Sequence, residues 1–145
     1  MQFWISHFYN VRHFPAYMVP VSTAIWDPKW YHDGKGDNYI FIDKNGIVNG
    51  IKCLALNPSK IPQSCSKDCK QNPSDCTFKR DYLAYLRTLD FEYTLARIEN
   101  SVKKLPGIGD ICLLVHEAPS NPCGERECLK EWFLENDYYL KEWTP

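Results

Sequence analysis

Four side chains able to carry chemistry lie close together between an apolar run and the start of a helical pattern. His116 and Glu117 follow the run Ile-Cys-Leu-Leu-Val, and Cys123 and Arg126 introduce the pattern ending in LKEWF. A histidine or glutamate can hold or shuttle a proton, and a cysteine at a helix start is favoured as a thiolate. An arginine there can bind phosphate or carboxylate through two hydrogen bonds. The stretch 111–133 is therefore the first candidate for a site.

A strand-to-helix crossing would position these side chains. The continuous apolar run within residues 110–116 is typical of a strand covered on both faces, as in parallel sheets. Residues 124–136 follow with apolar positions on one helical face. Ligands of open α/β sheets settle beyond the carboxyl ends of the strands, and a helix start presents backbone N–H groups and a positive dipole end. Gly124 and Arg126 are therefore predicted to face an anion.

A purely structural interpretation of the same turn also stands. Glu125 and Glu127 flank Arg126, and acidic residues in a first turn complement the helix dipole. In that case Arg126 only pairs with one of them, and the loop caps the helix. The spacing from Cys123 to Arg126 also differs from that of cysteine phosphatases, whose phosphate loop lies between the two residues, and this disfavours that enzyme class.

The other ligand-binding candidates lie near the ends of the first two predicted strands. Ser6 ends the first of these and offers a pocket hydroxyl. Trp30 and Tyr31 lie in the loop 26–34, after a second strand at 19–25, where aromatic rings can stack on a nucleobase. Packing of these rings over the end of the sheet, as core, is the alternative interpretation.

Cys65, Cys69 and Cys76 fall in a proline-containing loop at about 57–76. A tetrahedral zinc site needs four ligands, usually in closely spaced pairs, so these three thiols would need a fourth ligand from elsewhere. The chain has seven cysteines and no export-type leader pattern, which makes a disulfide framework unexpected. A structural zinc ion, free or redox-paired thiols, and a catalytic metal remain as alternatives.

The rest of the pattern indicates further strands and two helices. A hairpin is predicted at 39–48 around Asn-Gly, and a further strand at 51–56. One helix is expected to run from a cap at Ser74 to about Leu89. Asp90 is expected to cap the next helix, whose apolar positions step by four and three: Phe91, Leu95, Ile98, Val102 and Leu105.

This order of elements predicts the fold class and the number of domains. We expect an α/β fold with a central, mostly parallel sheet flanked by helices on both sides, and a small peripheral hairpin. The length of 145 residues fits a single domain spanning residues 1–145.

Composition limits the function classes. The net charge is −1 without a basic cluster, which disfavours general nucleic-acid binding. No apolar run approaches the length of a membrane span. The opening MQFWISHFYNVRHF lacks the basic start and apolar run of a signal peptide, so a cytoplasmic location is expected.

The chain resembles the YeaO-like proteins, domain-of-unknown-function family 488. Three stretches carry the likeness: FWISHFYNVRHFP followed by VPVS, then DPKWYHDG, and LLVHEAPSNPCGERECLKEWF. RDYLAYLRTL also suits the family's Tyr-rich middle helix, and only about residues 35–50 and 60–76 lack a counterpart. The resemblance implies an α/β sandwich with a pocket formed by these stretches, at which Glu117, Cys123 and Arg126 match the family. It implies no activity, because the family's biochemical role is not established.

The chain departs from the family pattern in two places. Many relatives carry Cys-His-Arg-His at the last helix, whereas this chain has Cys-Gly-Glu-Arg-Glu, with Cys123 one place further from Arg126. Relatives also tend to carry an arginine where this chain has Ala24 and Ile25. The resemblance therefore indicates which residues belong to a site, but it does not indicate what reaction they would catalyse.

Three functions follow from these residues. The first is a small-ligand binding protein that holds and sequesters an anionic, nucleotide-like compound, with Arg126 and the helix start on the phosphate and the loop rings on the base. The second is an enzyme that cleaves or transfers a glycosidic bond of a nucleoside-type substrate, with Glu117 or His116 as acid or base and Cys123 as nucleophile. The third is a metal-stabilised interaction domain. Neither the ligand nor the oligomeric state follows from the sequence.

Overall fold

The computed structural model describes residues 1–31, 39–43, 46–61, 76–103, 109–116 and 124–145, and the helices and strands named below lie within them. The elements are β1 (Phe3–His7), η1 (Phe8–His13), β2 (Met18–Ser22), η2 (Lys29–Tyr31), β3 (Tyr39–Asp43), β4 (Gly46–Lys52), η3 (Leu54–Leu56), η4 (Pro58–Lys60), α2 (Thr77–Arg87), α3 (Phe91–Val102), β5 (Asp110–Val115), α4 (Glu125–Glu135) and β6 (Lys141–Glu142). The η elements are short 3-10 helices.

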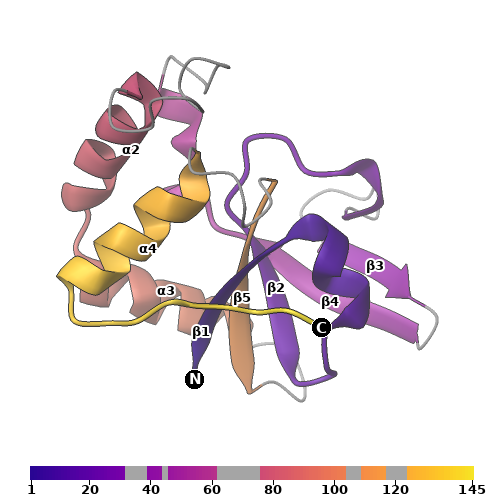
Figure 1. The fold of residues 1–145 in the computed structure, drawn as a ribbon. Coiled ribbons are helices and arrows are strands. Elements are labelled where there is room, and N and C mark those ends of the chain that lie inside the picture. Colours follow the sequence, from indigo (N-terminus) through magenta and orange to yellow (C-terminus); the bar gives the residue numbers. More distant parts are fainter. Residues whose placement is uncertain (32–38, 44–45, 62–75, 104–108, 117–123) are drawn as a thin grey trace.

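The fold is α/β, as predicted, and is built on one sheet with the strand order β3-β4-β2-β5-β1-β6. The five strands from β4 to β6 are parallel, and β3 joins the edge antiparallel to β4. The predicted hairpin is therefore confirmed at the edge of the sheet, and the end of its second strand, β4, pairs with β2. Parallel strands carry their carboxyl ends to one edge, which is the upper edge of the sheet in Figure 1.

Buried side chains on both faces of β5 explain why its sequence is continuously apolar. Ile111, Leu113 and Val115 belong to the larger core cluster, while Cys112 and Leu114 belong to a second cluster on the opposite face. Side chains alternate between the two faces of a strand, so a strand between two cores has no polar position. The apolar run thus correctly predicted a central parallel strand.

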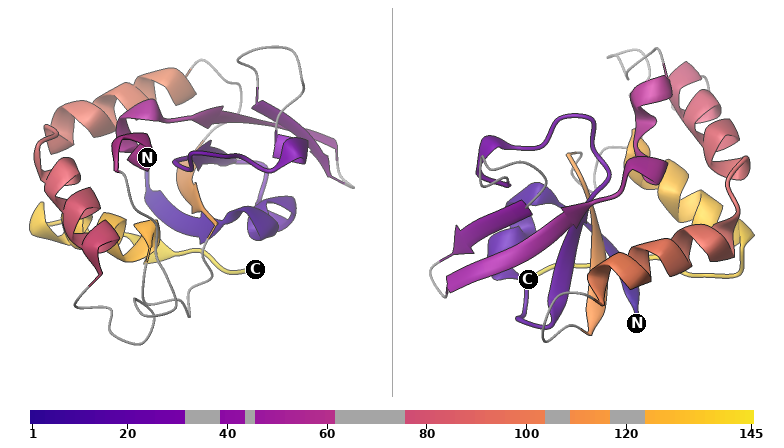
Figure 2. Two further views of the ribbon diagram at one scale, coloured as in Figure 1. Left: turned by 90° about the horizontal axis from the view of Figure 1, so that it is seen from above. Right: turned by 180° about the vertical axis from the view of Figure 1, so that it is seen from behind.

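The two faces of the sheet are covered differently. All three described α-helices pack on one face, and η1 lies on the other (Figures 1 and 2). The predicted amphipathic patterns supply the helical side of the larger core, through these buried side chains: Phe78, Tyr82 and Leu86 of α2, Phe91, Leu95, Ile98 and Val102 of α3, and Leu129, Trp132 and Phe133 of α4. Helices do flank both faces, but on the second face the described residues form 3-10 turns and no α-helix.

Two helix starts show how side chains fix the ends of these elements. Asp90 caps α3, as predicted, because its carboxylate accepts the N–H of Tyr93 at 2.9 Å. At α2 the N-cap is Cys76, whose Sγ accepts the N–H of Lys79 at 3.4 Å. The predicted cap at Ser74 is therefore displaced to Cys76, and Ser74 itself lies outside the described residues.

The strand predicted at Ile51 to Leu56 is wrong. Pairing of β4 with β2 ends at Lys52, and the next residues turn into η3. The hydroxyls of Tyr82 and Tyr85 on α2 donate to the carbonyls of Leu56 and Ala55. These carbonyls therefore find their hydrogen bonds on a helix instead of a neighbouring strand.

The described helices are also too short or too polar to cross a bilayer.

Candidate functional site

Buried polar side chains gather where β1, β2 and β5 end. Parallel pairing brings His7 of β1 and Ser22 of β2 level with the last residues of β5, and α4 begins after the loop that leaves β5. The buried polar and charged residues near this edge are Ser6, Ser22, Thr23, Glu125 and Arg126. Burial of such groups requires hydrogen bonds or ion pairs to offset lost hydration. A polar region therefore lies inside the fold at the carboxyl edge, the place where the sequence predicted the site.

Arg126 is the centre of a group of titratable side chains that we name the Arg126 group: His7, Arg126, Lys130 and Glu142. The side chain of Arg126 is 0% exposed, and its Nη1 donates to Oε1 of Glu142 on β6. Lys130, one helical turn further along α4, approaches the same oxygen at 2.9 Å. Two cations thus share one carboxylate, and these three side chains together carry a net positive charge.

His7 lies beside this pair on the helical face of the sheet. Burial, and secondly the positive charge of Arg126, lower the pKa of His7 below its ordinary value, and Glu142 partly opposes the shift. Among the described residues, Nδ1 of His7 and Oε2 of Glu142 are buried atoms without a hydrogen-bond partner. The Arg126 group therefore combines a neutral imidazole with hydrogen-bonding capacity that the described side chains do not use.

The start of α4 differs from the starts of α2 and α3. Its N-cap is Gly124, with φ of 107°, and a glycine offers no side-chain acceptor to the first turn. A positive φ of this kind suits glycine, because other residues adopt it at a cost. Glu125 is buried and meets the hydroxyl of Thr23 at 2.9 Å, which joins the helix start to the end of β2.

Ser6 and His116 lie on the opposite face of the sheet from Arg126. The Ser6 hydroxyl donates to the carbonyl of Trp143 at 3.0 Å and accepts from the amide of Asn10 at 2.9 Å. The exposed ring of His116 lies 4.7 Å from the ring of Phe8, and its Nε2 contacts the carbonyl of Trp26. The predicted site residues therefore lie on both faces of the sheet at this edge, with Arg126 on one face and Ser6 and His116 on the other.

The loop after β2 presents an exposed tryptophan at this edge. Trp26 is 80% exposed. The loop is held by the Ser22 hydroxyl, which donates to Asp27, and by Lys52, whose Nζ lies 3.3 Å from Asp27 and 3.2 Å from the carbonyl of Ile25. A fixed loop with an exposed ring is suited to stacking on a flat ligand.

The rings predicted to bind a base occupy other places. Tyr31 is 0% exposed, and its hydroxyl donates within the core to the carbonyls of Pro20 and Ile51, at 3.0 and 2.7 Å. Its ring packs edge-on against Phe8. The core interpretation of Tyr31 therefore fits the structure. Trp30 lies in η2, and its side chain is outside the described part of the chain.

Four predicted residues lie outside the described residues: Glu117, Cys123, Cys65 and Cys69. Cys76 is buried as the N-cap of α2. Within the described ranges, no group of three or more potential metal ligands comes together. The zinc site of the cysteine loop stays a prediction.

His7, Lys130 and Glu142 were not predicted as site residues, whereas the exposed Trp26 lies in the loop 26–34, which was predicted to present aromatic rings to a base. Glu142 was missed because β6 is only two residues long and has no strand pattern. His7 follows Ser6, and strand alternation places the two on opposite faces. The same alternation places His7 on the face of Phe3 and Ile5, which pack against the last helix. This pattern in the sequence is the signal that could have identified His7.

Comparisons of the chain with protein-family models, with curated proteins and with solved structures find no match.

Proposed function

We propose that this protein binds a small anionic, nucleotide-like ligand at the carboxyl edge of its sheet, at the crossing from β5 to α4. The observation that carries the proposal is the convergence of Arg126 and Lys130 on the single carboxylate of Glu142. A phosphate bound nearby would add a second anion to this pair of cations, through charge-assisted hydrogen bonds. The start of α4 adds the positive end of a helix dipole.

The phosphate would bind nearer Lys130 than Arg126. Lys130 is 31% exposed, while Arg126 is fully buried. In this arrangement Arg126 sets the local charge and holds Glu142, and Lys130 reaches the ligand. The base would stack on Trp26, the exposed ring of the same edge. A binding protein of this kind would sequester its ligand without changing it.

Three compounds distinguish the contribution of the phosphate to binding from that of the base. Adenosine 5′-monophosphate, adenosine and inorganic phosphate would be compared by isothermal titration calorimetry. We expect the monophosphate to bind more tightly than either part. Loss of the charged contact in Lys130→Ala should weaken binding about tenfold or more, and loss of stacking in Trp26→Ala should have an effect of similar size.

Tyr17→Ala provides the matched aromatic control, because Tyr17 is 52% exposed at the opposite, amino edge of the sheet. Its affinity should equal that of the parent protein. The proposal fails if none of the three probes binds, or if Lys130→Ala and Trp26→Ala bind the monophosphate as tightly as Tyr17→Ala does.

A second candidate function is an enzyme that cleaves or transfers the glycosidic bond of a nucleoside-type ligand. His7 favours it, because a neutral imidazole beside a carboxylate can accept a proton. Chromatography of a long incubation with the monophosphate would reveal release of free adenine. Release that is lost in His7→Gln supports the enzyme, and intact ligand after binding supports the binding protein.

A further inference from the structure

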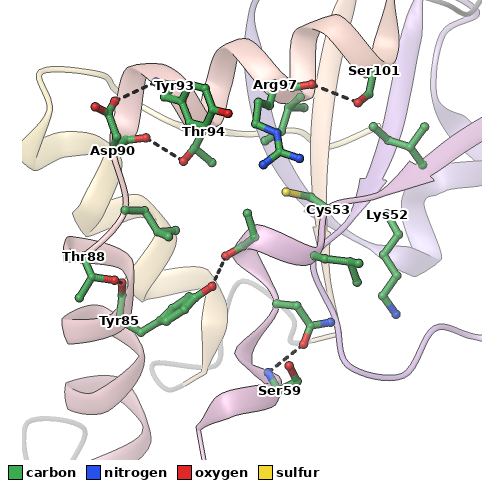
Figure 3. A pocket seen from close by; sticks show the side chains of 16 residues that line it. Lys52, Cys53, Ser59, Tyr85, Thr88, Asp90, Tyr93, Thr94, Arg97 and Ser101 are labelled. Carbon is green, nitrogen blue, oxygen red and sulfur yellow. Dashed lines mark hydrogen bonds between the residues drawn. The ribbon is translucent and has the colours of Figure 1, made fainter.

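A groove runs along α3 on the helical side of the sheet, away from the Arg126 group. It lies between α3 and the segment from the end of β4 through η4, and α2 closes one end (Figure 3). Its volume is about 770 Å³, within the range of about 300–1,000 Å³ of sites for small molecules. No member of the Arg126 group lines it.

The groove has an apolar lining with exposed apolar groups at its rim. Ile51, Ala55, Leu89 and Ile98 contribute to the lining. Leu54, on η3, is 75% exposed and also lines the groove. Removal of such surface from water is favourable, so a bound molecule would gain from an apolar body.

Most polar groups of the groove are already engaged within the protein. The Tyr85 hydroxyl donates to the carbonyl of Ala55 at 2.6 Å, and the Thr94 hydroxyl donates to the carbonyl of Asp90 at 2.7 Å. The carboxylate of Asp90 caps α3. The negative charge at this end of the groove is therefore balanced by the helix dipole and demands no cation.

Arg97 is the exception among the charged groups of the groove. Its guanidinium extends from α3 into the groove, over Cys53 (Figure 3). In the described parts of the chain it has no ion pair, and its guanidinium carbon lies 5.8 Å from the centre of the Tyr93 ring.

The sequence of α3 explains why Arg97 lacks a counter-ion on its own helix. Side chains three and four residues apart are neighbours on a helix. The neighbours of Arg97 at these spacings are Tyr93, Thr94, Asn100 and Ser101, none of which is acidic. Asp90 lies seven residues earlier, about 10 Å along the helix at 1.5 Å per residue.

We propose that this groove binds a small amphipathic monocarboxylate, with the carboxylate on Arg97 and an alkyl or aryl body along the apolar lining. A carboxylate matches the two-pronged geometry of a guanidinium. Among the described lining residues, Arg97 is the cation without an ion pair, while Lys52 is paired with Asp27, so a doubly charged nucleotide fits the groove poorly. This site is independent of the ligand proposed for the carboxyl edge.

The test uses decanoate as the carboxylate and 1-decanol as its uncharged counterpart, with the full chain in each titration. We expect decanoate to bind and to shift the amide resonances of Ala55, Thr94 and Arg97 in ¹H–¹⁵N spectra. 1-Decanol should bind at least about tenfold more weakly, because it lacks the charge-assisted hydrogen bonds. Arg97→Gln should lower the affinity for decanoate by about the same factor.

Arg12→Gln is the matched control. Arg12 is another exposed arginine beside a tyrosine ring, 3.9 Å from the centre of Tyr9, and it lies on η1 at the opposite face of the sheet. This variant should bind decanoate like the parent. A second variant, Ala55→Phe, fills the groove without touching Arg97 and should abolish binding while the circular-dichroism spectrum stays that of the parent.

Several results would overturn the inference. They are equal affinity of Arg97→Gln and the parent, equal affinity for 1-decanol and decanoate, and amide shifts around Lys130 in place of the groove. Competition supplies a further check: adenosine 5′-monophosphate should not displace decanoate, and displacement would show that the groove is not a separate site. Failure of the monophosphate to bind at all would count against the carboxyl-edge proposal alone.

Discussion

Two arginines on neighbouring helices meet opposite conditions in this fold. Arg126 of α4 is fully buried and paired with Glu142, whereas Arg97 of α3 is exposed in a groove without a carboxylate partner among the described residues. A charge removed from water must be paired, because its lost hydration is otherwise uncompensated. A charge that keeps its hydration can stay single. Burial therefore decides which arginine serves the fold and which is available to a ligand.

This difference determines which substitutions can test function. Removal of Arg126 leaves Glu142 in a mostly buried place, so a loss of binding would not be separable from a loss of structure. Arg97 can be replaced without leaving a buried partner. Lys130 is the corresponding residue of the Arg126 group, since it is partly exposed and shares a carboxylate that Arg126 still holds.

The largest expected effect is on stability, at the buried pair. Glu142→Ala removes the carboxylate that Nη1 of the buried Arg126 contacts and should lower the free energy of unfolding by about 3 kcal/mol. Urea denaturation followed by circular dichroism measures this loss. Glu131→Ala is the control, because it removes a carboxylate 4.0 Å from Arg87 in a pair whose side chains are both 53% exposed, where the loss should stay below about 1 kcal/mol.

Equal losses in Glu142→Ala and Glu131→Ala would break the comparison between the two arginines. Such a result would mean that other contacts stabilise the buried charge of Arg126 and that its burial does not depend on Glu142.

A smaller effect is expected at the end of the Arg97 groove, where Asp90 caps α3. Asp90→Ala should lower the free energy of unfolding by about 1 kcal/mol. Asp90→Asn should lower it by only a few tenths of this amount, because asparagine caps helices about as well as aspartate does. Thermal or urea unfolding distinguishes the two variants. If Asp90 instead balances the charge of Arg97, the neutral asparagine will cost as much as alanine.

Much of the fold was predictable because its main elements have local patterns that agree with their burial. The apolar run of β5 predicts a strand between two cores, and the spacing from Phe91 to Val102 predicts the buried face of α3. Asp90 was correctly identified as a cap. The strand expected through Leu56 was wrong because tyrosine hydroxyls from α2 take the carbonyls of that segment, and no local pattern records a partner so distant in the sequence.

Within the candidate site, the sequence predicted only those residues whose type and local position are enough to identify them. Arg126, in the first turn of a helix after a buried strand, could be identified in this way. Its partner Glu142 belongs to β6, which exists only through its pairing with β1. Tyr31 is core and Trp26 is exposed, although both lie in the loop that was predicted to stack on a base. Burial of single loop residues depends on how η1 and η2 pack, which the loop sequence does not specify.

The smallest expected effect is on the pH dependence of the free energy of unfolding. It tests the Arg126 group through the pKa of His7. The pKa of His7 is lowered in the folded protein, so the unfolded chain binds a proton first as the pH falls below the ordinary value of 6.5. The stability that neutral His7 contributes is therefore present above pH 6.5 and is lost progressively as the pH falls toward the lower, folded pKa. Urea unfolding between about pH 7.5 and pH 5.5 should show this decline in the parent.

His7→Gln should flatten the decline, because glutamine does not titrate, while His13→Gln should keep it, because His13 is exposed on η1. An unchanged slope in His7→Gln would mean that His7 reaches solvent and feels neither burial nor Arg126. In that case the contrast between a buried Arg126 and an exposed Arg97 would be weaker, because the charge of Arg126 would have no measurable effect on the pKa of His7. A flattened slope instead shows that His7 titrates below its ordinary pKa in the folded protein, as burial and secondly the charge of Arg126 require.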